Sequence, residues 1–176
     1  MSLPTSQSAV ALRHAFDRAF AEPPTPRGAA DEALVLIRVA ESTHALRLDE
    51  IGGLHAGRKI AQLPSAAPAL LGLVGLRSAL APVYDLRVLL GYPGAAAPRW
   101  IAVARGAQPV GLAFDAFERQ VRVPLGAISL AAAADAARPH LAGVVRIEAA
   151  SIPLIHVASI VDAIAGHAGA RPPKER

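Results

Sequence analysis

Residues 72–91 read Gly-Leu-Val-Gly-Leu-Arg-Ser-Ala-Leu-Ala-Pro-Val-Tyr-Asp-Leu-Arg-Val-Leu-Leu-Gly, and this stretch decides the fold. Short apolar runs at 70–76 and 79–84 have the length of strands, and residues 77–78 form the turn between them. The pattern therefore predicts a hairpin of two strands, followed by a short helix.

The predicted helix and the strand before it carry residues with specific backbone roles. Asp85 can accept hydrogen bonds from the free amides of the first helical turn, and Gly91 can adopt the left-handed conformation that ends a helix. Pro82 has no amide hydrogen, so its strand lies at a sheet edge or where the ladder is already broken. Arg77 is a lone charge between two apolar runs, so its guanidinium lies in solvent or meets a partner.

The composition limits the classes of protein to which the chain can belong. The chain has 176 residues, 53% of them hydrophobic, which fits one ordinary domain or two small ones that share a core. It has no cysteine, no apolar run of membrane-spanning length and no secretion signal, so we expect a cytoplasmic protein without disulfides or thiolate metal sites. The formal charge of +4 comes from scattered arginines with one basic pair, Arg58-Lys59, which favours a weakly basic surface over a nucleic-acid site.

The N-terminal region differs from the rest of the chain. Positions 9–21 place Leu12, Phe16 and Phe20 on one helical face, and a proline-rich linker follows at 22–28. A helix of this length is marginal alone in water, so we expect its apolar stripe to dock. It can dock on its own body or in a groove of another protein, and we slightly favour a partner or a second copy.

The remaining chain alternates short apolar runs with turn residues, which is typical of an all-β protein. Besides the central hairpin, strands are predicted at 34–39, 44–48, 100–104, 110–114, 118–123, 141–147 and 152–157, with a closing helix at 159–165. Segment 53–68 is predicted to be a loop with at most one short strand near 60–63, and 126–139 a helical turn or a loop. About nine strands at hairpin spacing favour a barrel or a sandwich.

The central hairpin resembles the signature of the CheW family, the coupling proteins of bacterial chemosensory arrays. That family typically shows Gly-x-x-Asn-Leu-Arg-Gly, a few apolar residues and then Pro-Val-x-Asp-Leu. The matching positions are Gly72, Leu76, Arg77, Pro82, Val83, Asp85 and Leu86, whereas Gly75 and Ser78 replace the usual Asn and Gly. Shorter matches lie at 48–51, which resembles Val-x-Glu-Ile, and at 111–117, which resembles Gly-Leu-x-Val-Asp-x-Val.

The resemblance implies a specific architecture of two small five-stranded, SH3-like barrels that share an apolar seam, with a groove between them. The chain would then have three parts. These are an N-terminal helix and linker over 1–30, a CheW-like domain of two intertwined barrels over 31–165, and a tail over 166–176 that we expect to be disordered.

The resemblance also implies two partners. In the family, one barrel packs against the regulatory domain of a CheA-type histidine kinase, and the groove takes the tip of a chemoreceptor's helical hairpin. The receptor-binding surface is predicted at Arg77, which matches the family's receptor-contacting arginine, and at Leu48, Glu50, Leu76 and Ser78. Leu48 and Glu50 are expected to share a strand face. The kinase-binding surface is predicted at Val110, Leu112, Phe114 and Phe117, and self-association stays open.

No catalytic or metal-binding pattern is apparent in the sequence. The six histidines lack metal-ligand spacing, no glycine-rich phosphate loop is followed by Lys-Ser, and no serine lies in a nucleophile elbow. His156 is interpreted as a core or edge histidine of an apolar strand, and Asp85 and Asp115 as caps. We therefore expect neither enzymatic activity nor a cofactor.

Two classes of function stay open. The first is a non-catalytic adaptor that is recruited to membrane-associated receptor arrays without inserting into the membrane. The second is a basic small-barrel protein that binds nucleic acid, although that class requires aromatic side chains among clustered arginines. The sequence also leaves open whether an adaptor of this kind would serve flagellar chemotaxis or a dedicated system for surface motility, biofilm or second-messenger output.

Overall fold

The computed structural model describes residues 31–64, 67–76, 79–93, 98–130 and 140–169. Its strands are β1 Asp31–Val39, β2 Ser42–Arg47, β3 Ile51–Ala56, β4 Leu70–Leu76, β5 Ala79–Asp85, β6 Trp100–Ala104, β7 Val110–Phe114, β8 Ala116–Pro124, β9 Ile128–Leu130, β10 Leu141–Ile147 and β11 Ala150–Ile155. Its helical elements are the 3-10 turns η1 Leu48–Glu50 and η2 Leu125–Ala127, and the helices α2 Leu86–Leu89 and α3 Val157–Gly169. The helix predicted at 9–21, and Arg77 and Ser78, lie outside the described residues.

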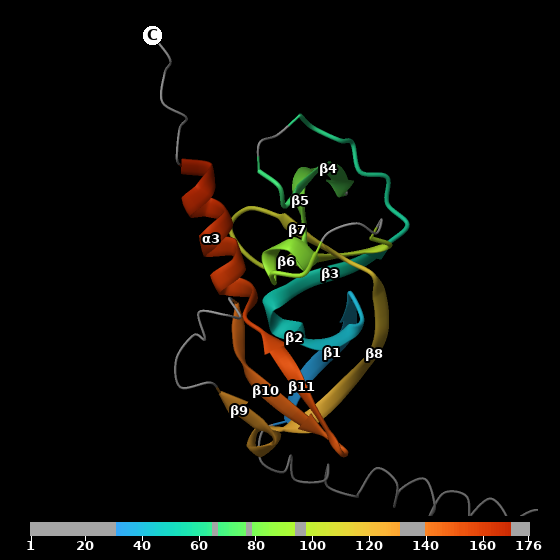
Figure 1. The fold of residues 1–176 in the computed structure, drawn as a ribbon, viewed down its shortest axis with the longest axis vertical. Coiled ribbons are helices and arrows are strands. Elements are labelled where there is room, and N and C mark those ends of the chain that lie inside the picture. Colours follow the sequence, from blue (N-terminus) through green and yellow to red (C-terminus); the bar gives the residue numbers. More distant parts are fainter. Residues whose placement is uncertain (1–30, 65–66, 77–78, 94–97, 131–139, 170–176) are drawn as a thin grey trace, which may run out of the picture.

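The strands form two sheets, each with an apolar core of its own (Figure 1). Barrel 1 has six strands in the order β8-β1-β2-β11-β10-β9, and barrel 2 has five in the order β3-β6-β7-β5-β4. The prediction of an all-β fold built from two small barrels is confirmed. Barrel 1 has six strands instead of five because β9 pairs with β10, in a stretch too short for its periodicity to be read from sequence.

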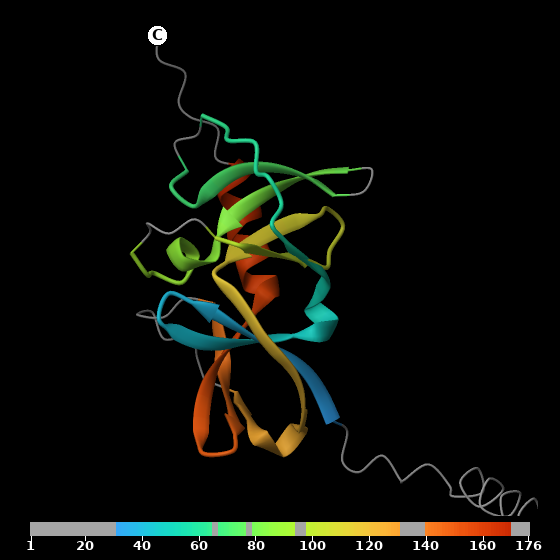
Figure 2. The same ribbon diagram turned by 90° about the vertical axis from the view of Figure 1, so that its right-hand side faces the viewer.

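A third cluster of buried side chains fills the seam between the barrels. It includes Ile37 and Leu46 from barrel 1, and Leu112 and Phe114 from barrel 2. The chain crosses this seam twice, from β2 through η1 into β3 and from β7 directly into β8 (Figure 2). Because burying each large apolar side chain contributes roughly 1.5–3 kcal/mol, the seam joins the two barrels into one body.

Barrel 2 is completed by a close approach of backbone to backbone at Gly72. The segment after β3 forms a single bridge to β4, in which the amides of Ala61 and Leu73 each donate to the other residue's carbonyl at 2.8 Å. Gly72 has φ +142°, and a Cβ placed there would lie 2.1 Å from the Ala61 carbonyl oxygen. The strand predicted near 60–63 is therefore only this bridge. The strand β3 lies earlier, in a stretch where Gly52 and Gly53 hid the apolar pattern.

The central hairpin and its helix are confirmed at the predicted positions. Pro82 lies in an inner strand, but the pairing of β5 with β7 begins only at the next residue, Val83, so the ladder is interrupted as the proline requires. Asp85 Oδ1 accepts a hydrogen bond of 2.9 Å from the Arg87 amide and so caps α2. Gly91 follows the helix with φ +80°.

The C-terminal helix is longer than predicted, because α3 begins at Val157 and continues to Gly169 instead of ending at residue 165. His156 lies exposed between β11 and α3, so its interpretation as a strand histidine is wrong. His140 Nδ1 lies 3.0 Å from Ser159 Oγ, which ties the start of β10 to α3. Burial, and then the neighbouring His156, lower the pKa of the His140 imidazole.

Candidate partner-binding surfaces

The register of barrel 2 places three connections at one of its ends. Ile51 of β3 lies opposite Ala104 at the end of β6, and Ala104 lies opposite Val110 at the start of β7. Strand β5 enters the sheet parallel to β7, so Leu76 and Ala79 of the hairpin lie at this end as well. In Figure 2 the teal turn η1, the yellow β6–β7 turn and the adjoining ends of β4 and β5 all lie on the right. We call this the η1 end of barrel 2, and it carries the segments that contain the predicted receptor-binding residues.

Hydrogen bonds around Glu50 hold the η1 end together. Glu50 Oε2 accepts a bond of 3.3 Å from the Val157 amide at the start of α3, and its carbonyl accepts one of 2.8 Å from the Arg105 amide. Arg47 Nη1 lies 3.9 Å from Glu50 Oε1. Leu48 packs against the seam. The expectation that Leu48 and Glu50 share a strand face is wrong, because both lie in the 3-10 turn η1, where residues two apart point in different directions.

A cleft of about 260 Å³ opens beside Glu50, between η1, the β6–β7 turn and α3. Three carboxylates and one guanidinium line it together with apolar side chains of α3, and the full lining is Asp49, Glu50, Arg105, Val157, Ala158, Val161 and Asp162. The cleft offers apolar surface to a partner beside an excess of negative charge.

The hairpin adds an exposed apolar side chain to the η1 end. Ala81 is fully buried, whereas Leu80 is 70% exposed, as the period of two along β5 requires. Leu80 lies opposite Gly75, which is also exposed. The predicted receptor residue Leu76 is buried in the core of barrel 2. Sequence reasoning missed Leu80, although the alternation of β5 could have identified it.

The predicted kinase-binding residues are mostly buried. Val110, Leu112 and Phe114 face the seam with at most 7% of their surface exposed, so they offer nothing to a partner and this part of the predicted surface is corrected. Both faces of β7 are covered because it lies between two cores. Phe117 is 36% exposed, and its ring centroid lies 5.5 Å from that of Trp100. Phe117 and Trp100 form what we call the aromatic pair.

The aromatic pair lies away from the η1 end. Trp100 begins β6 and Ala104 ends it beside Ile51, and four residues of strand span about 13 Å. The two candidate surfaces therefore occupy opposite ends of the same strand.

An ion pair fastens the signature helix to the crossover between the barrels. Arg87 Nη2 of α2 lies 2.6 Å from Asp115 Oδ1, and both side chains are more than four-fifths buried. Asp115 Oδ2 also accepts a bond of 2.7 Å from the Ala40 amide in the β1–β2 turn, where Ala40 has φ +55°. The hydrogen bond that the Arg87 guanidinium donates to Asp115 raises the pKa of Arg87. Burial raises the pKa of the Asp85 carboxyl. Asp115 was predicted to cap its own turn, but it instead caps a turn of barrel 1.

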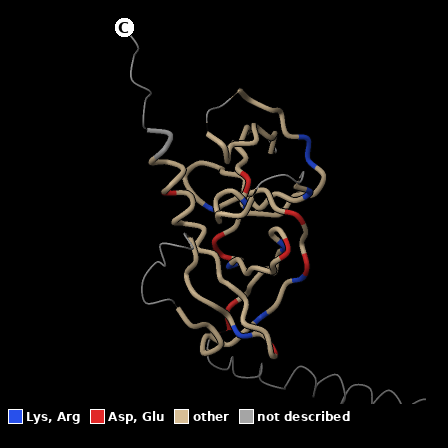
Figure 3. The backbone as a smooth tube through the Cα atoms, viewed as in Figure 1, with Lys and Arg blue, Asp and Glu red and all other residues tan. Residues whose placement is uncertain are grey.

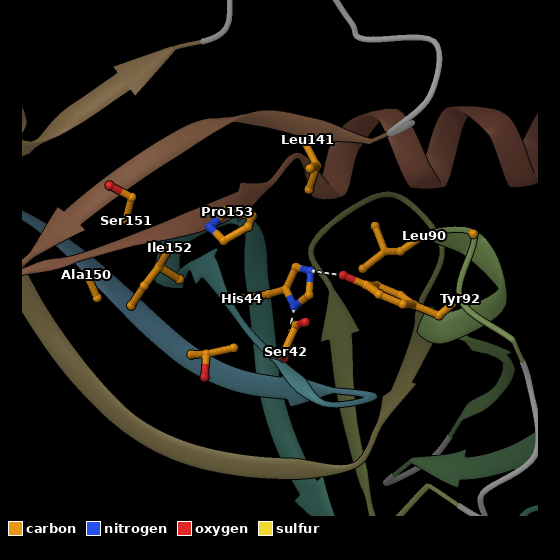
Figure 4. Close-up of a pocket in the computed structure, with 11 residues that line it drawn as sticks. Ser42, His44, Leu90, Tyr92, Leu141, Ala150, Ser151, Ile152 and Pro153 are labelled. Atoms are coloured by element: carbon orange, nitrogen blue, oxygen red, sulfur yellow. Dashed lines mark hydrogen bonds between the residues drawn. The ribbon is translucent and has the colours of Figure 1, made fainter.

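A second cleft, of about 560 Å³, lies between β2, β11 and the residues after α2 (Figure 4). His44 is 1% exposed, its Nδ1 donates to the Ser42 carbonyl at 3.1 Å, and its Nε2 lies 3.2 Å from the Tyr92 hydroxyl. This arrangement assigns the proton to Nδ1 and makes Nε2 the acceptor of the tyrosine O–H. Because these ring contacts are satisfied within the fold, they explain the position of His44 without a ligand.

The described part of the chain holds neither a metal site nor a membrane-spanning helix. No group of three or more His, Cys, Asp or Glu side chains there could hold a metal ion. No helix among them is long and apolar enough to cross a membrane.

Comparison with known proteins agrees with this architecture. Residues 33–165 match the family model of the CheW-like domain. The crystal structure of the scaffolding protein TtCheW from Thermoanaerobacter tengcongensis superposes with a TM-score of 0.64 at 19% identity, over 70% of this chain and 88% of that one. At this identity the likeness concerns the fold. No curated protein sequence matches the chain.

Proposed function

Since the chain belongs to the CheW-like domain family, we propose that it is a non-catalytic adaptor that couples chemoreceptors to a CheA-type histidine kinase. The observation that carries the proposal is the placement of the receptor motif. The hairpin ends that flank Arg77 and Ser78 lie at the same end of barrel 2 as Glu50 and the acidic cleft. One receptor tip can therefore contact segments that are far apart in sequence.

The kinase regulatory domain is proposed to bind at the aromatic pair. Phe117 is the member of the predicted kinase set that is exposed, and Trp100 extends its surface. Aromatic side chains are enriched at the centres of interfaces. Because the aromatic pair and the η1 end lie at opposite ends of β6, one molecule of the adaptor can hold both partners at once, and repetition in an array strengthens weak single contacts.

The departure from the family motif at Gly75 lies on the surface and leaves the fold intact. A Cβ at Gly75 would meet no atom within 4 Å, so packing does not demand glycine there. We therefore attribute Gly75 and Ser78 to recognition of a different receptor, which fits a dedicated chemosensory system outside flagellar chemotaxis.

The charge distribution gives no support to the nucleic-acid alternative. Figure 3 shows basic and acidic positions interspersed along the described chain instead of a long basic stripe. Arg38 pairs with Glu118 and Arg47 with Glu32, so part of the basic charge is neutralised within the fold. A groove that follows a phosphate backbone requires clustered cations.

Replacing Arg77 by alanine is expected to weaken binding of a receptor-tip fragment by about 2 kcal/mol, roughly 30-fold, while the chain stays folded. The reason is that a charged side chain at the centre of a packed interface makes contacts that water cannot replace. Calorimetric titration of the full chain with the fragment measures the effect.

The matched control for this change is Arg99→Ala. Arg99 is exposed beside Trp100, away from the η1 end, so its loss should leave receptor affinity within about twofold of the parent chain. Equal affinities for Arg77→Ala and the parent chain, with the variant folded, would remove Arg77 from the receptor surface.

A further inference from the structure

Three exposed cations lie around the aromatic pair. The Gly57 amide donates to the Arg99 carbonyl at 2.9 Å, which ties the end of β3 to the residue before Trp100. Arg58 and Lys59 follow Gly57 directly, and both are exposed, as is Arg99. Because successive Cα atoms lie only about 3.8 Å apart, the long side chains of this basic pair come within reach of the surface beside Trp100. We call Arg58, Lys59 and Arg99 the basic rim.

The charge of the basic rim is not neutralised within the described part of the chain. None of its three members forms an ion pair there, whereas Arg38, Arg47 and Arg87 each pair with a carboxylate. In Figure 1 the segment that follows β3 runs along the same side of the molecule as β8, the strand that carries Phe117. The basic rim therefore offers three positive charges to a partner that contacts the aromatic pair.

The aromatic pair supplies an apolar anchor and not an open platform for stacking. The Trp100 ring stacks on Phe114 with their centroids 6.4 Å apart, and it packs against the seam. Its centroid also lies 5.5 Å from that of Phe117. Single-stranded nucleic acid binds to aromatic rings whose faces are open to its bases. The ring contacts within the fold therefore favour a protein as the partner of the basic rim.

The two ends of barrel 2 carry opposite charge. The cleft at the η1 end is lined by Asp49, Glu50 and Asp162 beside a single guanidinium. The basic rim adjoins Trp100 at the other end of β6. Juxtaposed like charges are costly, so each end of the barrel repels a partner that suits the other end. The partner of the basic rim should therefore present an acidic surface.

We propose that the basic rim and the aromatic pair form one docking face for an acidic surface of the kinase regulatory domain. Phe117 packs on an apolar side chain of that surface, and the basic rim pairs with the Asp or Glu side chains around it. Exposed charges at the edge of an interface act mainly by steering association, and they make its rate depend on salt. This inference rests on the proposed kinase contact at the aromatic pair and adds to it the charge of the partner's surface.

Association kinetics test the proposal, with the full-length chain and a CheA-type kinase regulatory domain mixed by stopped flow at a series of salt concentrations. Arg58→Glu combined with Arg99→Glu should slow association about tenfold or more at low salt and remove most of its salt dependence, while dissociation changes much less. The matched control is Arg122→Glu combined with Arg146→Glu, which makes the same change of net charge at two exposed arginines of barrel 1. The control should associate within about threefold of the parent chain.

The outcomes separate this inference from the proposed function. Equal association rates for the two double variants would overturn the inference, and loss of kinase binding in Phe117→Asp would then leave the kinase contact standing without it. Failure of the folded parent chain to bind the kinase domain would contradict both.

Two further measurements exclude other acidic partners. Sedimentation velocity of the chain alone at low salt should show no self-association that Arg58→Glu with Arg99→Glu removes. If it did, the basic rim would bind the acidic cleft of a second copy and the inference would be overturned. A labelled single-stranded oligonucleotide should not bind the parent chain at physiological salt, and binding that requires the basic rim would assign the face to nucleic acid and overturn the inference as well.

Discussion

Replacing Gly72 by alanine is expected to destabilise the chain by about 3 kcal/mol or more. The new Cβ would lie 2.1 Å from the Ala61 carbonyl oxygen, 2.8 Å from its carbonyl carbon and 3.0 Å from the Gln62 Cα. All three atoms belong to backbone, so no side chain can move aside to relieve the clash. The φ of +142° adds strain that only glycine avoids.

The measurement is the free energy of unfolding by denaturant, and Gly75→Ala is the matched control. Both glycines lie in β4, but a Cβ at Gly75 would meet nothing within 4 Å. We expect the control to change stability by less than about 0.5 kcal/mol. If the two variants were equally stable, the close approach of β4 to Ala61 would not be what completes barrel 2.

Replacing Asp115 by alanine is expected to cost about 3 kcal/mol, because it leaves a largely buried guanidinium without its partner. Arg87 has 16% of its side chain exposed and lies 2.6 Å from Asp115 through Nη2. The same substitution removes the acceptor of the Ala40 amide in the strained β1–β2 turn. Both losses fall on the junction between the barrels, so they should lower the stability of the whole domain cooperatively.

Denaturant unfolding also measures this effect, with Arg119→Ala as a control at an exposed ion pair. Arg119 lies 3.9 Å from Glu148, with 54% and 81% of the two side chains exposed, so its loss should change stability by no more than about 0.5 kcal/mol. In a double-mutant cycle, the loss from Asp115→Ala should shrink strongly in an Arg87→Ala background. Independent, additive effects would show that the two residues do not act as one unit.

Local chemistry made the central hairpin and its helix predictable from sequence. Proline, aspartate and glycine each have few acceptable backbone environments, and Pro82, Asp85 and Gly91 occupy the expected ones. The division into two barrels came from the resemblance to the CheW family, since periodicity alone does not show which strands pair.

Long-range contacts explain what the sequence did not show. Asp115 looks like a turn cap, but its acceptor oxygens serve Ala40, 75 residues away, and Arg87 on another element. His44 is an unremarkable histidine in sequence, yet it is buried because β2 lies between two cores. Such partners become visible only once strands that are distant in sequence are placed side by side.

The candidate surfaces were predictable in part. The resemblance to the CheW signature led to Glu50 and to the hairpin around Arg77, and the register of barrel 2 places these segments at one end. The predicted kinase surface was wrong at Val110, Leu112 and Phe114, because a strand that is buried on both faces has the same apolar composition as a strand that exposes apolar side chains. Of these four predicted residues, Phe117 is the exposed one.

The adaptor role itself is tested most directly by asking whether one molecule of the chain bridges the two proposed partners. Full-length chain, a CheA-type kinase regulatory domain and a chemoreceptor tip fragment are mixed, and the mass of the complex is measured by sedimentation velocity. We predict a ternary complex, loss of only the receptor fragment with Arg77→Ala, and loss of only the kinase domain with Phe117→Asp. Competition of the two partners for one surface, or failure of the folded chain to bind either, would contradict the proposed function.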